Sequence, residues 1–453
     1  FITTIFAIFK LIAKFAVMIL FRYLPILFIL FFWSCKEKVT NTKVFTSADL
    51  VNANTKLLHI AMEDGFPPPI ASRVYVYPHI AHYLALEYNY PDSLPALSKK
   101  LNGLPSFTFK SNNDALPELT ALLSFCNVAR KVVFSEYMID ELQQGILKKA
   151  KDGNISEKVI EASSENANAI SSHLMEWIKN DNYIQTRTMD RWTSSKDPGK
   201  WRETPPDYQI GLEPNWDKMR QILTDSTDMY VPAPLPAYSP DVNSDFYKMV
   251  NKVYTTSMSL DSAKIATAWY WDDNPNTSEH RGHAVAIIHK VSPPGHWLNI
   301  ISGIINAQKD NIFKSTKAYT FSAIAMYDGI ISCWYQKYKT NLVRPVSYIQ
   351  EYIDVNWNPL IQTPPFPEYT SGHSVISASA ATVLNSIYGS DLAFVDSTQT
   401  LFGLAPRTFE NFDQAAWEVS LSRFYGGIHF YNGIEEGNKQ GKFIGNAVIN
   451  KLK

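Results

Sequence analysis

The sequence predicts an all-α protein built from two adjacent helical bundles. Apolar residues recur at intervals of three and four along most of the chain after residue 45, which is the spacing of one helix face. The strict alternation of apolar and polar residues that is typical of a half-buried strand is rare. The 453 residues are 45% hydrophobic and 13% aromatic, which is enough apolar material for a large packed core.

Helix-start and helix-stop signals divide this pattern into segments. Three prolines at residues 67–69 separate the first two helices, and Ser156 stands in a capping position. Residues 186–240 are rich in Trp, Pro, Asp and Ser and predict a long irregular excursion. We therefore predict an N-terminal helical region over residues 45–240 and a C-terminal bundle with the active site over residues 241–453. The first expected helix begins at residue 47. The others cover residues 71–90, 116–151, 156–180, 244–267, 296–310, 315–337, 371–388, 413–425 and 432–452.

Residues 1–34 predict a signal peptide, with Met18 as a candidate for the true start. A short positive segment containing Arg22 is followed by an apolar stretch and then by Cys35. A small residue before a Cys resembles a bacterial lipoprotein processing site. We expect a lipid on Cys35, a linker over residues 35–44, and a protein exported to the periplasm or cell surface. The alternative is a retained signal anchor, because residues 2–33 could span a bilayer.

The charge and cysteine counts exclude other classes of protein. The formal net charge is −1, so we expect no nucleic-acid partner, and any basic cluster is local. Three cysteines do not make a disulfide framework, and Cys126 and Cys333 lie in apolar runs that predict buried free thiols. Whether the protein is a monomer or a homodimer stays open.

A basic pair, Lys337 and Arg344, stands at the end of the helix predicted over residues 315–337. Lys337 is its last residue, and Arg344 follows seven residues later. Trp334 lies three residues before Lys337 and so shares its helix face. Pro345 biases Arg344 away from helical geometry, which places its guanidinium at a helix exit. Alone, such a pair is more often solvated than functional.

A second motif, Ser371-Gly372-His373, stands where the next helix must begin. The preceding prolines, Pro365 and Pro367, favour an extended approach. A helix start offers free backbone N–H groups and the positive end of the helix dipole, which favours an anion. On its own the motif also fits an ordinary capped helix with a surface histidine.

A third motif joins Arg423, in the last turn of a predicted helix, to His429. Gly426 and Gly427 stop the helix between them and allow both side chains to face one point. Alone, it also fits a glycine-ended helix with an unrelated histidine.

Together the three motifs resemble the signature of the vanadium-dependent haloperoxidases and of the type 2 phosphatidic acid phosphatase superfamily, which shares their site. That signature is Lys-x6-Arg-Pro, then Ser-Gly-His, then Ser-Arg-x5-His, and every position is filled here. Thr370 replaces the usual Pro before Ser-Gly-His, a change that we expect to affect the backbone and not an anion ligand. The segment Pro-Pro-Gly-His-Trp at residues 293–297 also matches bacterial haloperoxidase-like members. The resemblance is strong from about residue 265 onward.

The resemblance implies a vanadate (vanadium V) cofactor, with hydrogen peroxide and a halide as substrates. Fixed cations suit a highly charged oxyanion, and arginines can donate to it in bidentate fashion. His429 is implied as the vanadium ligand, and His373 and Lys337 as the catalytic residues. The implied cofactor-binding residues are Lys337, Arg344, Ser371, Gly372, Arg423 and His429.

Two aromatic residues favour the haloperoxidases over the phosphatases. Trp334 and Phe366 occupy positions where haloperoxidases resembling this chain place aromatic rings around the approach of the halide. The position of Phe366 is His in the bromide-oxidising algal enzymes, so Phe fits chloride- or iodide-oxidising relatives better. Iodide is the halide most easily oxidised, so we expect iodide to be preferred.

Two alternatives stay open. One is an acid phosphatase of the same superfamily that forms a phosphohistidine at His429, and the other is a non-catalytic surface lipoprotein that binds phosphate-like anions. His280, His283 and His289, near residues 272–273, lack the spacing of a zinc motif, so we interpret the whole patch as loop and core structure.

Overall fold

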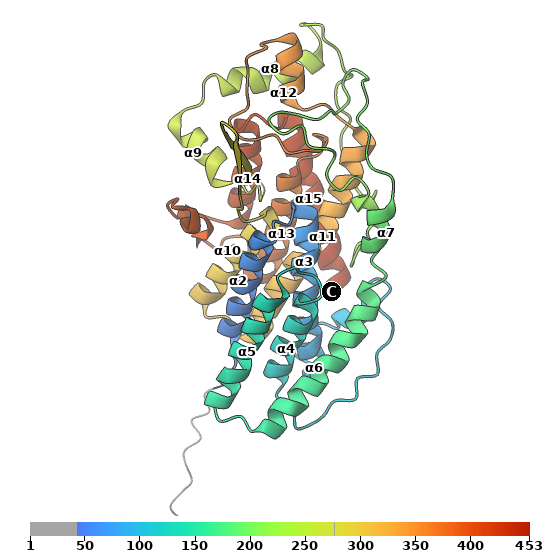
Figure 1. Ribbon diagram of the computed structural model, residues 1–453, viewed down its shortest axis with the longest axis vertical. Helices are drawn as coiled ribbons and strands as arrows, with labels where there is room; N and C mark the ends of the chain where they lie inside the picture. Colours follow the sequence, from blue (N-terminus) through green and yellow to red (C-terminus); the bar gives the residue numbers. More distant parts are fainter. Residues whose placement is uncertain (1–42, 276) are drawn as a thin grey trace, which may run out of the picture. The chain divides into compact units, whose positions relative to one another are not determined.

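Helices make up nearly all of the regular structure between Phe45 and Lys453 (Figure 1). The computed structural model describes residues 43–275 and 277–453, so the predicted signal peptide and Cys35 lie outside the described part of the chain. Within that part, no helix is long and apolar enough to cross a membrane. The predicted all-α architecture is confirmed, and the boundary between residues 240 and 241 stays a prediction.

Residues 47–178 form five helices, of which α4 contacts each of the other four. Within this group α3 contacts α4, and α4 contacts α6. We predicted one helix over residues 116–151, which was wrong. The Asp64 carboxylate accepts the backbone N–H groups of Phe134 and Ser135 and the Ser135 hydroxyl, and these bonds hold a turn between two helices. The helices are α2 (Ser47–Glu63), α3 (Pro68–Asn89), α4 (Pro117–Ala129), α5 (Glu136–Asp152) and α6 (Glu157–Ile178).

The irregular excursion is present as predicted and is tied to the core by one buried carboxylate. Asp328, in the middle of α11 (Ile312–Thr340), accepts the backbone N–H groups of Ile222, Leu223 and Thr224 at 2.7–2.9 Å. A buried carboxylate needs such partners, so this contact holds the loop on the helix. The excursion contains only α7 (Tyr183–Thr188), at its start, and a short 3-10 helix, η2 (Trp216–Lys218).

Eight helices follow, and they differ from the prediction by one divided helix, one additional helix and shifts of up to three residues at helix ends. The helix predicted over residues 244–267 is divided, because the Asp261 carboxylate caps a new helix by accepting the Lys264 N–H. The short α12 was not predicted. The helices are α8 (Asp245–Ser257), α9 (Ser262–Tyr270), α10 (Pro293–Gln308), α11 (Ile312–Thr340), α12 (Pro345–Tyr352), α13 (Gly372–Tyr388), α14 (Phe412–Tyr425) and α15 (Tyr431–Leu452).

Two short antiparallel hairpins, which the helical pattern did not predict, complete the described structure. β1 (Thr277–Arg281) pairs with β2 (Ala284–Ile288), and β3 (Phe394–Asp396) pairs with β4 (Arg407–Phe409). His280 lies on β1, where its Nε2 atom is 2.7 Å from Oδ1 of Asp207.

Helix α11 connects the two halves, since it packs on α3 on one side and on α13 on the other. Helix α13 in turn packs closely on α15 (Figure 1). A stripe of glycines on α15, made by Gly437, Gly441 and Gly445, lies at this contact. A Cβ atom on Gly437 would lie 2.8 Å from the carbonyl oxygen of Ser371, and one on Gly445 would lie 2.7 Å from the Cβ of Thr382. The absence of side chains at these positions lets the two backbones approach, which places the N-terminus of α13 against α15.

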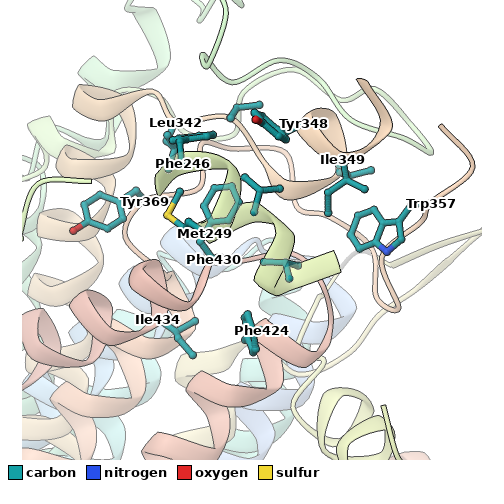
Figure 2. Packing of buried hydrophobic residues seen from close by; sticks show 14 residues of the cluster. Phe246, Met249, Leu342, Tyr348, Ile349, Trp357, Tyr369, Phe424, Phe430 and Ile434 are labelled. Carbon is teal, nitrogen blue, oxygen red and sulfur yellow. The ribbon is translucent and has the colours of Figure 1, made fainter. Parts of the chain in front are cut away.

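A cluster of buried apolar side chains joins α8, α12, α14 and α15 (Figure 2). Several of its members directly neighbour predicted site residues in sequence. Val343 precedes Arg344, and Phe424 follows Arg423. The cluster thus anchors the backbone on which these charged side chains stand.

We predict opposite stability effects for two glycine substitutions. In Gly441→Ala the new methyl group would lie 2.8 Å from the Cβ of Ala378 and closer still to the carbonyl oxygen of Val375. We expect a loss of about 1–3 kcal/mol, as for other overpacked cores. In the control Gly145→Ala, on the exposed surface of α5, nothing lies within 4 Å, and the better helix propensity of alanine should stabilise by about 0.5–1 kcal/mol. Urea unfolding of both variants measures this, and equal effects would contradict the close packing.

Candidate active site

Every predicted anion ligand stands at or next to a helix end. Lys337 is in the last turn of α11, and Arg344 is the N-cap of α12. Ser371 caps α13, where its hydroxyl accepts the Ser374 N–H. Arg423 is in the last turn of α14, and His429 lies in the turn before α15. Helix ends bring unpaired backbone groups and flexible turns to one place, which suits a binding site.

Gly372, His373, Arg423 and His429 line one narrow cavity with a volume of about 70 Å³. Lys337, Arg344 and Ser371 are not part of this lining and lie directly behind it. A single buried water needs roughly 10–15 Å³ by this measure, so the cavity holds only a few small molecules. The Nη1 atom of Arg344 lies 3.2 Å from the Nε2 atom of His429. A Cβ atom on Gly372 would lie 3.9 Å from the Cε atom of Lys337. The cavity-lining residues include Trp334, Phe366, Gly372, His373, Arg423 and His429.

The backbone before α13 holds two of the cations. Lys337 donates from Nζ to the carbonyl oxygens of Pro367 and Glu368, each at 3.0 Å. Arg344 donates from Nε to the carbonyl oxygen of Phe366 at 2.8 Å. An ammonium has three N–H donors, so Lys337 retains one beyond these two bonds.

Three side-chain nitrogen atoms around the cavity are buried and have no hydrogen-bond partner within the described residues. They are Nη2 of Arg344, Nε of Arg423 and Nε2 of His373. Nearly all buried polar atoms in proteins are paired, so an unpaired group needs an explanation. Guanidinium donors of this kind are matched by an oxyanion, which accepts several bonds at once.

The cations are crowded in an environment that disfavours their charge. Burial, together with Arg344, lowers the pKa of Lys337 to about 7. Burial, together with Arg423, lowers the pKa of Arg344 to about 9. Burial and the neighbouring cations also lower the pKa of His373 and of His429 well below their usual range, so both imidazoles are neutral. An anion in the cavity would offset the repulsion among these groups.

The Glu368 carboxylate is a site residue for which the sequence predicted no role. Its Oε1 atom lies 2.6 Å from Nδ1 of His429 and accepts the N–H of Phe430 at 3.0 Å. Glu368 is completely buried, and burial raises its pKa to about 7 against the lowering effect of Arg344 and Lys337. A signal was present, because Glu368 is the single acidic residue in the proline-rich segment before Ser371.

The acidic pair Asp272 and Asp273 also contributes to the site, a role that the sequence did not predict. Asp272 forms an ion pair with Lys290 at 2.8 Å and faces Arg423, with 3.8 Å between Oδ1 and Nη2. Asp273 lines the cavity. Arg423 also donates from Nη1 to the carbonyl oxygen of Trp271, so this segment orients its guanidinium.

A buried histidine holds Asp273 in place from behind the cavity. His296 bonds Asp273 through Nδ1 at 2.9 Å and Asp396 through Nε2 at 2.7 Å. Burial alone would lower its pKa, but the two carboxylates raise the pKa of His296 to about 10, so the ring is a cation. His296 stacks on Trp271, with 4.5 Å between ring centroids. It belongs to the segment at residues 293–297 that the resemblance singled out.

The two predicted halide-side aromatics lie together at one wall of the cavity. The rings of Trp334 and Phe366 are 5.0 Å apart, and Lys337 Nζ lies 4.9 Å from the centroid of Phe366. Thr370, the departure from the usual motif, donates its hydroxyl to Gln440 on α15. Its side chain is thus bonded to α15, and its expected effect on the backbone stays a prediction.

Comparisons with known proteins agree with this geometry. A family model described as the VCPO second helical-bundle domain matches residues 317–453. A solved structure described as the first bacterial vanadium-dependent iodoperoxidase has a TM-score of 0.83 and 36% sequence identity, and the match covers 90% of this chain and 97% of that chain. No curated protein matches the chain.

More distant structures share the fold. The holo-type and apo-type bacterial vanadium-dependent chloroperoxidases have TM-scores of 0.64 and 0.59, each at 15% identity. Both matches cover 85% of this chain, and they cover 93% and 95% of the respective structures. On the 36% identity over nine-tenths of its length, the chain belongs to the vanadium-dependent haloperoxidase family.

Proposed function

We propose that the protein uses a bound vanadate to oxidise iodide with hydrogen peroxide to hypoiodous acid. The observation that carries this proposal is the set of unpaired, buried nitrogen atoms of Arg344, Arg423 and His373 around a small cavity. The similar bacterial iodoperoxidase supports both the cofactor and the halide.

The residues present fit a tetrahedral oxyanion that also bonds one histidine. Lys337, Arg344 and Arg423 would hold the vanadate oxygens by charge and hydrogen bonds. Ser371 and Gly372 add a hydroxyl and a backbone N–H at the start of α13, where the helix dipole favours negative charge. His429, as a neutral imidazole, would bind vanadium through Nε2. When bound, vanadate supplies Lewis-acid activation of peroxide without a change of its own oxidation state.

The protein groups then handle protons and charge. His373 is neutral and its Nε2 atom is unpaired, so it can accept a proton from incoming peroxide and return it later. The remaining N–H of Lys337 would polarise an oxygen of the bound peroxide and so ease halide attack. Asp272 keeps the Arg423 guanidinium oriented while these steps take place.

The aromatic wall favours iodide. A halide that approaches Trp334 and Phe366 must lose part of its hydration shell, and the cost of desolvating an ion falls as its radius grows. Iodide is the largest common halide and the easiest to oxidise. Both properties favour it over bromide and chloride in this cavity.

We also propose that the protein is exported and carries a lipid on Cys35. The order of a positive, an apolar and a Cys-ended segment in residues 18–35 supports this. In the native host, Cys35→Ser should move the protein from the membrane fraction to the soluble fraction. A protein that stays in the membrane fraction would instead indicate a retained signal anchor.

We predict that iodide oxidation depends on vanadate. Purified protein loaded with orthovanadate should form triiodide from iodide and peroxide, at least about tenfold faster than it oxidises bromide, a difference of about 1.4 kcal/mol. Untreated apoprotein should be inactive. Hydrolysis of p-nitrophenyl phosphate that vanadate inhibits, without iodide oxidation, would support the acid phosphatase instead. Inactivity in both assays would support an anion-binding lipoprotein.

We predict different defects for the two cavity histidines. His429→Ala should lose vanadium retention, because the vanadium ligand is removed. His373→Ala should retain vanadium but lose activity, because proton transfer is removed. Vanadium content after gel filtration, measured beside turnover, separates the two. His59→Ala, which removes an exposed histidine on α2, serves as the control and should change neither quantity. Equal vanadium content in His429→Ala and wild type would refute the assigned roles.

A further inference from the structure

We propose that Glu368 is a positioning residue that holds His429 in the tautomer able to bind vanadium and thereby sets the affinity for vanadate. This inference rests on the proposed function and names a residue that acts through the vanadium ligand. It follows from the hydrogen-bond partners of the two ring nitrogens.

The two neighbours of His429 assign its tautomer independently. On one side, Nη1 of Arg344 lies 3.2 Å from Nε2, and a guanidinium can only donate, so Nε2 must carry the lone pair. On the other side, Oε1 of Glu368 lies 2.6 Å from Nδ1 and accepts the Phe430 N–H, and an ionised carboxylate only accepts, so Nδ1 carries the proton. Both contacts leave the Nε2 lone pair directed at the cationic side of the cavity.

A glycine on α15 leaves room for the Glu368 carboxylate. A Cβ atom on Gly433 of α15 would lie 3.0 Å from the Cδ atom of Glu368 and closer still to its Oε1 atom. Any larger residue at position 433 would therefore displace the carboxylate from His429. Glu368 has no exposed surface, and its Oε2 atom has no partner among the described residues. The hydrogen bonds of this carboxylate are thus made to the imidazole of His429 and to the backbone N–H of Phe430.

A carboxylate behind a metal-binding histidine has two effects. It fixes the orientation and tautomer of the ring, and it makes the distal nitrogen a better electron donor. Loss of such a partner typically weakens metal binding by about 10- to 100-fold. The negative charge also opposes any anion in the cavity, so its removal alone would strengthen anion binding.

The effect through His429 strengthens vanadate binding, whereas the negative charge weakens the binding of any anion. The affinities for vanadate and for inorganic phosphate therefore distinguish the two effects. Vanadate needs the bond to His429, whereas inorganic phosphate is held only by charge and hydrogen bonds. If Glu368 acts through His429, Glu368→Gln weakens vanadate and leaves phosphate unchanged or tighter. If Glu368 acts only through its charge, Glu368→Gln tightens both anions.

The test is equilibrium dialysis of apoprotein against orthovanadate and, separately, against inorganic phosphate. We expect Glu368→Gln to bind vanadate about 10- to 100-fold more weakly than wild type, without weaker binding of phosphate. Gly433→Ala keeps the charge but displaces the carboxylate, so it should also weaken vanadate and not tighten phosphate. The matched control is Glu87→Gln, which changes another buried glutamate. Glu87 lies on α3 and accepts the backbone N–H of Ser98, so its replacement should leave both affinities unchanged.

A direct readout of the tautomer keeps the inference separate from turnover. In ¹⁵N spectra of histidine-labelled apoprotein, His429 should carry its proton on Nδ1 in wild type. In Glu368→Gln the amide can donate to Nδ1, so part of the population should shift to the Nε2–H form. Vanadate affinity within about threefold of wild type, or an Nε2–H tautomer in wild type, would overturn the inference. Vanadate binding without iodide oxidation would contradict the proposed function alone.

Discussion

Three cations, Lys337, Arg344 and Arg423, are buried within a helical core, and most of the surrounding structure bears on that arrangement. Like charges held together away from water repel one another and are costly unless they are paired. The chain supplies part of the compensation, through Glu368 and Asp272 and through backbone carbonyls that accept from Lys337 and Arg344. The remainder is left as unpaired donors around a cavity. The site is therefore preorganised for an oxyanion before any anion binds.

The scaffold explains how such a site is kept rigid. The cations stand at helix ends, and two of them adjoin the cluster in Figure 2, because Val343 precedes Arg344 and Phe424 follows Arg423. The glycine stripe on α15 allows α13 to approach closely, which brings the helix start at Ser371 beside the turn that carries His429. Behind this layer, His296 joins Asp273 to Asp396 and so fixes the acidic segment that orients Arg423. Fixed positions of this kind reduce the reorganisation that binding and turnover would otherwise require.

The sequence predicted the helical class and the main ligands, because both are carried by local patterns. Helical spacing is visible within one segment, and the three basic motifs have characteristic separations. Breaks within long apolar runs were missed where a distant side chain causes them, as Asp64 does at Ser135. Glu368 and Asp272 were missed for a related reason. Their roles depend on which side chain lies opposite them in the folded chain, and no spacing along the sequence encodes that.

The central claim is that the buried cationic cavity holds vanadate with His429 as its protein ligand. X-ray absorption at the vanadium edge of the loaded wild-type protein tests it most directly. The account predicts one nitrogen donor in the first coordination shell, in addition to oxygens, and the loss of that nitrogen when His429 is replaced. A shell made of oxygen alone in the wild-type protein, or a nitrogen that persists in His429→Ala, would contradict it.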